Sequence, residues 1–131
     1  MRILGLILLL AACSPQAPDP KIEEVTYAGN GRDRLCMEGD RAGFITYGEG
    51  DANCSAHGRI DRTGGQRLAI IPDGDQDCRI EANEDAGAIR LGGVTAACAY
   101  YCGPGASFEG KAFTKRATPS PALDFAGDPL C

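Results

Sequence analysis

Few side chains in this sequence could carry out nucleophilic chemistry. His57 is the only imidazole, and a serine nucleophile needs such a base within hydrogen-bond reach. His57 lies between Ser55 and Arg59 on the polar side of an alternating segment, where we expect it to face solvent. Ser107 lies in Gly-Ala-Ser-Phe-Glu-Gly, whose second glycine comes one position too late for a G-x-S-x-G nucleophile elbow. The acidic residues cluster in turns, which indicates solvated carboxylates. We therefore expect no catalytic residues and no enzymatic activity.

One run of acids has the spacing of a metal site. Asp73, Asp75 and Asp77 offer oxygen ligands at alternate positions, as calcium prefers, and Glu84 falls at position twelve of an EF-hand count from Asp73. Position six is Cys78, where that loop needs glycine, and neither flank reads as a helix. The pattern favours a Pro-Asp-Gly hairpin turn with solvated acids, so no metal or other cofactor is expected. Calcium-dependent binding through Asp73 to Glu84 is the alternative function.

The segment Cys-Ala-Tyr-Tyr-Cys-Gly-Pro-Gly-Ala-Ser, residues 98 to 107, is the most distinctive. Tyr100 and Tyr101 could form a recognition surface, because tyrosine supplies large contact area at low entropic cost. Packing inside a domain with few aromatic residues is the reading that the composition favours. A redox dithiol is a third reading, but three residues separate the cysteines where the C-x-x-C motif has two.

The chain has seven cysteines, and the spacing of the last six lacks the paired C-x-x-C of structural zinc, so a zinc site is not expected. Only 23 large apolar residues (Val, Ile, Leu, Met, Phe and Tyr) occur after residue 12, which is little core for a domain of this size. Three disulfides, each contributing about 2 to 4 kcal/mol, would supply the missing stability. Two of the cysteines are only four positions apart, so we expect each to pair elsewhere. The candidates are Cys36, Cys54, Cys78, Cys98, Cys102 and Cys131.

Length and charge exclude several classes of protein. The chain has 131 residues, enough for one small domain. Its 13 Lys and Arg against 18 Asp and Glu give a formal net charge of -5. A nucleic-acid binder needs a basic face to neutralise phosphates, so nucleic acid is not an expected partner. A polybasic membrane-binding patch is disfavoured for the same reason.

The N-terminal segment has the pattern of an export signal. Arg2 precedes an apolar run from Ile3 to Leu10, and small residues follow. A membrane-spanning helix needs about 20 apolar residues, so this run is too short to cross a bilayer. A basic start, a short apolar core and small residues at the cleavage point predict a signal peptide over residues 1–12.

The end of that segment, Leu10-Ala11-Ala12-Cys13, resembles the lipobox of bacterial lipoproteins. The resemblance implies cleavage before Cys13, a diacylglyceryl group on its thiol and acylation of its new amine. Two or three acyl chains give a stable anchor, whereas one holds a protein only marginally. Ser14, where Asp would suggest retention at the inner membrane, favours the outer membrane facing the periplasm. An ordinary signal peptide with Cys13 as a plain thiol is the alternative.

A tether separates the anchor from the folded domain. Residues 14–20 contain three prolines in seven positions and predict an extended linker. Residues 22–27 could add a short edge strand, but residues 29–34 read as loop. The expected organisation is a signal peptide at 1–12, a lipidated cysteine and tether at 13–33, and a domain at 34–131.

The domain has the two-residue period of β-strands. Residues 53–60 place Cys54 and Ala56 on one face and Ser55 and His57 on the other, and residues 77–82 repeat the alternation. Further strand candidates are residues 44–47, 67–71, 88–91 and 108–113. The short turns between them predict a mainly β, antiparallel meander that curls into a small sandwich or partial barrel. Residues 95–102 are expected to form a helical turn, and a short C-terminal helix is expected from Ser120.

Together these features predict a membrane-anchored periplasmic lipoprotein that acts as a non-enzymatic binding or envelope-accessory module. A protein partner is expected, and a small inhibitor of a secreted hydrolase is the most specific form of this hypothesis. That form rests on small size and rigidity alone.

Overall fold

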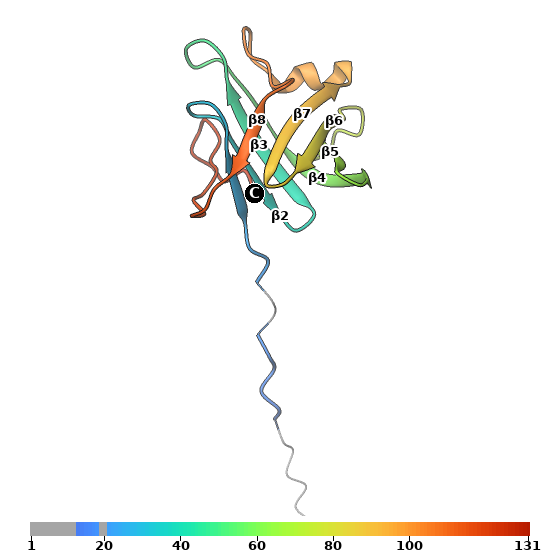
Figure 1. Cartoon of the computed structure of the whole chain (residues 1–131), viewed down its shortest axis with the longest axis vertical. Helices are drawn as coiled ribbons and strands as arrows, with labels where there is room; N and C mark the ends of the chain where they lie inside the picture. The colour runs from blue at the N-terminus through green and yellow to red at the C-terminus, as the bar shows by residue number, and fades with distance from the viewer. Residues whose placement is uncertain (1–12, 19–20) are drawn as a thin grey trace, which may run out of the picture.

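The computed structural model describes residues 13–18 and 21–131, in which eight antiparallel strands form a closed barrel (Figure 1). Each strand pairs with the next along the chain, and β1 pairs with β8 to close the barrel. The strands are β1 Val25–Ala28, β2 Arg34–Glu38, β3 Arg41–Tyr47, β4 Asn53–Gly64, β5 Arg67–Pro72, β6 Ile80–Asp85, β7 Ala88–Val94 and β8 Ala112–Lys115. The mainly β, antiparallel meander is confirmed, and closure leaves the sheet without an open edge. In the part of the chain described, no helix is long and apolar enough to cross a membrane.

The barrel begins before the predicted domain boundary, with β1, which overlaps the short strand expected at residues 22–27. Strand β1 pairs with β2 through Thr26 and Cys36, and with β8 through Tyr27 and Lys115. The predicted domain boundary near residue 34 is therefore wrong, because it would remove the strand that closes the sheet. The loop-like residues that suggested this boundary form the connection between β1 and β2, where Asp33 N–H donates to the Asn30 carbonyl.

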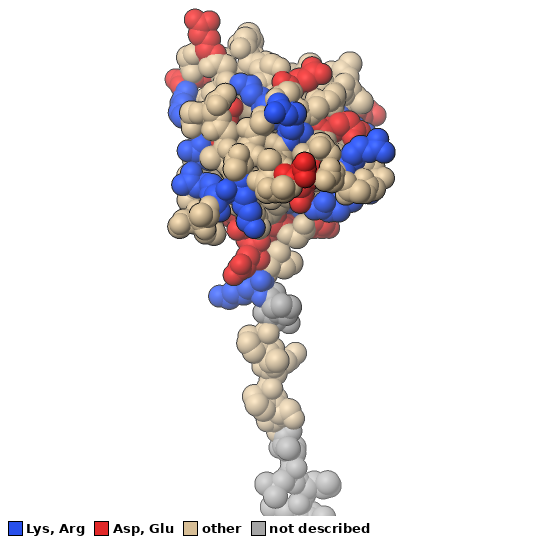
Figure 2. Space-filling view, viewed as in Figure 1, with Lys and Arg blue, Asp and Glu red and all other residues tan. Residues whose placement is uncertain are grey.

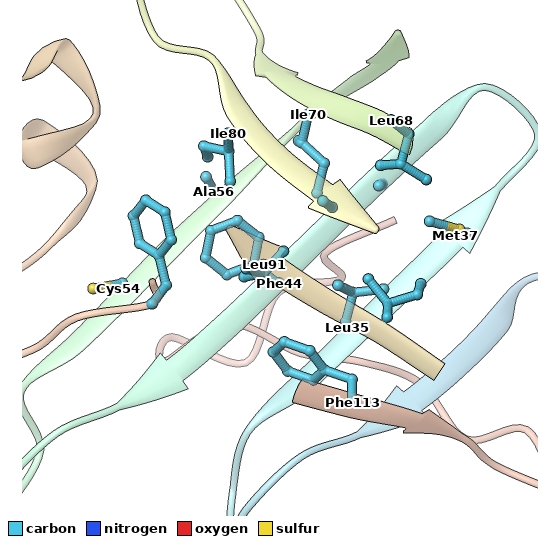
Figure 3. Close-up of a cluster of buried hydrophobic side chains, with 14 of the residues drawn as sticks. Leu35, Met37, Phe44, Cys54, Ala56, Leu68, Ile70, Ile80, Leu91 and Phe113 are labelled. Atoms are coloured by element: carbon cyan, nitrogen blue, oxygen red, sulfur yellow. The ribbon is translucent and has the colours of Figure 1, made fainter. Parts of the chain in front are cut away.

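Alternation along the strands sorts side chains between the barrel interior and its surface. On β4, Cys54 and Ala56 are buried, Ser55 is half-buried and His57 is exposed, as predicted. Phe44 of β3 lies at the centre of the interior and its ring contacts Phe108, with 5.2 Å between the centroids. An eight-stranded barrel is just wide enough for side chains to fill it. Figure 3 shows this core, which includes Leu35, Leu68, Ile70, Ile80, Leu91 and Phe113.

A second, smaller apolar cluster lies outside the barrel. Ala122 and Leu130, from the C-terminal segment, pack with Cys36 and Ile45 of strands β2 and β3. Gly43 permits this approach, since a Cβ there would lie 2.3 Å from the Leu130 carbonyl oxygen. The C-terminal segment thus covers part of the outer face of the barrel.

That segment is not the helix predicted from Ser120. Leu123 and Pro129 form an isolated β-bridge, and Gly127 in the turn between them has a positive φ of 91°. This path brings Ala122 and Leu130 against the barrel and leaves Leu123 and Phe125 exposed. The one helix of the described residues is η1, a 3₁₀ helix at Ala96–Tyr101, within the helical turn predicted at 95–102.

Three disulfides cross-link the fold, as predicted from the six cysteines. Cys36 pairs with Cys131, Cys54 with Cys102, and Cys78 with Cys98. The two close cysteines therefore bond elsewhere, as their spacing indicated. The first bridge fastens the C-terminus to β2, and the other two fasten η1 to β4 and to the residues that lead into β6.

Candidate functional site

The most exposed large aromatic side chain lies at the end of the short helix η1, between two disulfide-bonded cysteines. We call residues 98–102 the Tyr100 turn. Tyr100 is 85% exposed, and it lies between Cys98 and Cys102, both of which are cross-linked to other parts of the barrel. The two disulfides restrict the backbone that carries this side chain. The expectation that this residue packs inside the domain is therefore wrong.

Tyr101 behaves differently from its neighbour. It is half-buried against the core, and its hydroxyl donates a 2.9 Å hydrogen bond to Asp75 Oδ2. The two tyrosine rings meet edge to face, with 5.2 Å between their centroids. Packing, which the composition favoured, is thus confirmed for Tyr101, which in turn supports the ring of Tyr100.

Asp75 holds the loop on which Tyr101 rests. Its Oδ1 accepts hydrogen bonds from the backbone N–H groups of Asp77 and Cys78, each at 3.1 Å. The carboxylate thereby satisfies the turn with one oxygen and the tyrosine with the other. Partial burial and this hydrogen bond to Asp75 raise the pKa of Tyr101 to about 12.

The raised pKa of Tyr101 predicts a late step in alkaline titration. Because the native pKa exceeds the unfolded value of about 10, this group stabilises the fold fully below pH 10. That contribution is lost as the pH rises toward about 12. Phenolate absorbance of native protein minus that of Tyr101→Phe should show one tyrosine ionising at the upper end of this window. A difference titration curve with its midpoint at the ordinary pKa of tyrosine, about 10, would contradict the prediction.

Next to Tyr101, the surface has a hollow of about 210 Å³. It lies over β4 and the end of β5, and the C-terminal segment contributes one wall. The residues that line it are Ser55, Ala56, His57, Pro72, Asp73, Tyr101 and Asp124. We call this the His57 hollow. Sequence reasoning missed Asp124 in this set because no local pattern connects the C-terminal segment with β4.

The His57 hollow contains the residue types of a hydrolase site but not its geometry. The His57 side chain is 58% exposed, which confirms the expected solvent-facing histidine. Its Nε2 lies 3.7 Å from Asp73 Oδ2, beyond hydrogen-bond range. Arg41 pairs with both oxygens of that carboxylate, and its hydrogen bonds lower the pKa of Asp73. The carboxylate is thus held by a guanidinium instead of orienting an imidazole.

Ser107 lies elsewhere, on the segment that faces η1. Its backbone carbonyl accepts a hydrogen bond from Thr46 Oγ1 at 3.3 Å. It lines a separate hollow of about 260 Å³ together with Thr95, Cys98 and Phe108. His57 does not belong to this hollow, so the structure does not bring Ser107 to the imidazole.

The acids of the calcium alternative are engaged with different partners. Asp73 pairs with Arg41, Asp75 accepts from Tyr101, and Glu84 on β6 lies 3.5 Å from Arg62. Asp77 is exposed. Within the described ranges, no three His, Cys, Asp or Glu residues are grouped so that they could hold a metal ion.

These contacts predict the effect of calcium on stability. Millimolar calcium should leave the melting temperature within about 1 °C of its value in chelator, because a ligand stabilises a fold only by binding it. Asp73→Asn and Asp75→Asn should show the same insensitivity. A calcium-dependent rise of several degrees that either substitution removes would restore the calcium-binding hypothesis.

The remaining site residue from the sequence is Cys13, an exposed free cysteine. The rest of the lipobox-like motif, Leu10 to Ala12, and the signal peptide lie outside the described residues.

Figure 2 shows acidic and basic side chains intermixed on the viewed face of the barrel.

Comparison of the chain with protein-family models, with curated proteins and with solved structures finds no significant match.

Proposed function

We propose that this protein is a lipid-anchored, non-enzymatic binding module of the bacterial envelope, which recognises a protein partner through the turn that carries Tyr100. The observation that carries the proposal is the 85% exposure of Tyr100 on a turn bounded by two disulfide-bonded cysteines. The lipobox-like sequence that ends at Cys13 supports the anchor.

The rigidity of the turn favours binding. Association costs free energy for each side chain and loop that it immobilises, so a turn ordered in advance binds more tightly. Tyrosine is enriched among the residues that dominate protein interfaces. Tyr101 and Asp75 hold the base of the turn, leaving Tyr100 as its projecting group.

The position of the turn suits a tethered protein. In Figure 1, η1 lies at the end of the barrel opposite the end from which residues 21–24 leave it. The tether, residues 14 to 24, could span at most about 40 Å when fully extended. A barrel held in this way would present Tyr100 away from the membrane. A small, rigid inhibitor of a secreted hydrolase is the specific form of this function that we favour.

The anchor is tested by metabolic labelling. Cells that express the chain and receive a labelled fatty acid should incorporate label into it and retain it in the envelope fraction. Cys13→Ser should lose both properties. An unlabelled native chain that washes out of the envelope would overturn the anchoring part of the proposal.

The recognition surface is tested by capture from envelope extract. Tyr100→Ala should reduce partner recovery at least tenfold, the effect of losing a dominant interface residue worth about 1.4 kcal/mol or more. Ile22→Ala is the matched control, since Ile22 is an exposed apolar residue within the tether. Equal recovery of the same proteins by the native chain and Tyr100→Ala would show that the turn is not the binding surface.

A further inference from the structure

We propose that the His57 hollow accepts a basic side chain, lysine or arginine, from the protein partner. This inference rests on the proposed function and adds the chemistry of the partner to it. It follows from the size of the hollow, its carboxylates and the exposed aromatic residues beside it.

The size of the hollow fits one side chain. Pockets for drug-sized ligands occupy about 300–1,000 Å³, and this one measures about 210 Å³. Its accessible apolar lining comes from the half-buried ring of Tyr101, since Ala56 and Pro72 are almost fully buried. This ring would contact the methylene groups of a lysine or arginine, whose stems pack on apolar surface while the charged head stays polar.

The charge of the hollow selects a cation. The guanidinium of Arg41 is already paired with Asp73 and does not belong to the lining of the hollow. Asp124 lines the hollow and Asp75 contacts it through Tyr101, and neither carboxylate takes part in an ion pair among residues 21–131. Asp124 Oδ1 accepts the Asp128 N–H at 2.9 Å, which fixes the carboxylate while leaving its charge without a counter-ion.

Exposed aromatic residues adjoin two of the lining residues. Tyr100 packs edge to face on Tyr101, and Phe125, 58% exposed, follows Asp124 in the sequence. Aromatic faces attract cations, and apolar groups around a polar contact exclude water from it. The hollow and the Tyr100 turn therefore form one continuous surface, on which a partner that covers Tyr100 can place a basic side chain.

Three peptides test the charge preference by NMR. Acetyl-Gly-Arg-Gly-amide is titrated into the full-chain, isotope-labelled protein, with the glutamine and glutamate analogues as controls. The arginine peptide should shift the amide signals of Ser55, His57 and Asp124 in a saturable way, and the controls should not. Equal shifts with the arginine and glutamine peptides would overturn the inference.

Two matched variants locate the binding group. Asp124→Asn should weaken arginine-peptide binding at least threefold, since its amide oxygen still accepts the Asp128 N–H while the charge is lost. Asp128→Asn removes the same charge from the same segment outside the hollow and should leave binding unchanged. Matching melting temperatures establish that both variants are folded. Equal weakening by the two variants would show a general charge effect and overturn the inference.

Failure of this inference is distinguishable from failure of the proposed function. If Tyr100→Ala abolishes partner capture while the arginine peptide does not bind, the module stands and the basic side chain is wrong. If the peptide binds as described but Tyr100→Ala captures the partner normally, the hollow stands and the Tyr100 surface is wrong.

Discussion

Replacing Cys36 and Cys131 together with alanine is expected to lower the melting temperature by about 15 °C or more. The bridge closes a loop with a sequence separation of 95 residues. Cross-linking a loop of that size stabilises a fold by about 4 to 5 kcal/mol in the chain-entropy treatment. For a domain of about 100 residues, each kcal/mol corresponds to about 4 °C or more in melting temperature.

The same change should free the C-terminal segment from the barrel. Ala122 and Leu130 pack on Cys36 and Ile45, and the bridge at Cys131 holds them there. Hydrogen exchange should therefore increase at Leu130, whose N–H donates to the Ala122 carbonyl. Cys13→Ser, which removes a cysteine outside the bridges, is the control and should melt like the native chain. A double variant that melts within about 3 °C of the native chain would contradict the assigned role of this bridge.

Phe44→Ala should cost about 3 to 5 kcal/mol of the free energy of unfolding, measured by urea denaturation. Phe44 has no exposed surface and lies at the centre of the barrel against Phe108. A closed sheet cannot collapse around the missing ring, because each strand is hydrogen-bonded to two neighbours. The substitution therefore removes buried apolar area and leaves a cavity.

Phe125→Ala is the matched control, since it removes the same ring from an exposed position. Its unfolding free energy should change by about 0.5 kcal/mol or less, the usual effect of a surface substitution. Similar losses from the two variants would show that the barrel interior is not the main core.

The strands were predictable because their signal is local. Alternation in residues 53–60 reflects the pleat, which places successive side chains on opposite faces whatever the rest of the fold. Strand β4 begins at Asn53 as expected and continues to Gly64. The helix expected from Ser120 failed because its local signals, a proline and a later glycine, fit an extended segment with a turn equally well.

The candidate site was predictable only in part. Ser55 and His57 share a face by alternation, and Tyr101 was singled out with Tyr100 by its setting between cysteines. Asp124 lines the hollow because the C-terminal segment folds back on the barrel, and that path depends on the pairing of Cys36 with Cys131. Six cysteines at six positions do not specify their partners, so this pairing had no signal in the sequence.

The sequence by itself determined the strand periodicity and the lipobox-like N-terminus, since each depends on residues close together in the chain, and its overall composition indicated the need for cross-links. Tertiary structure decided which cysteines pair, that β1 closes the sheet, and that Tyr100 projects while Tyr101 packs. These properties arise from contacts between residues far apart in sequence, whose energies depend on the distances that folding creates.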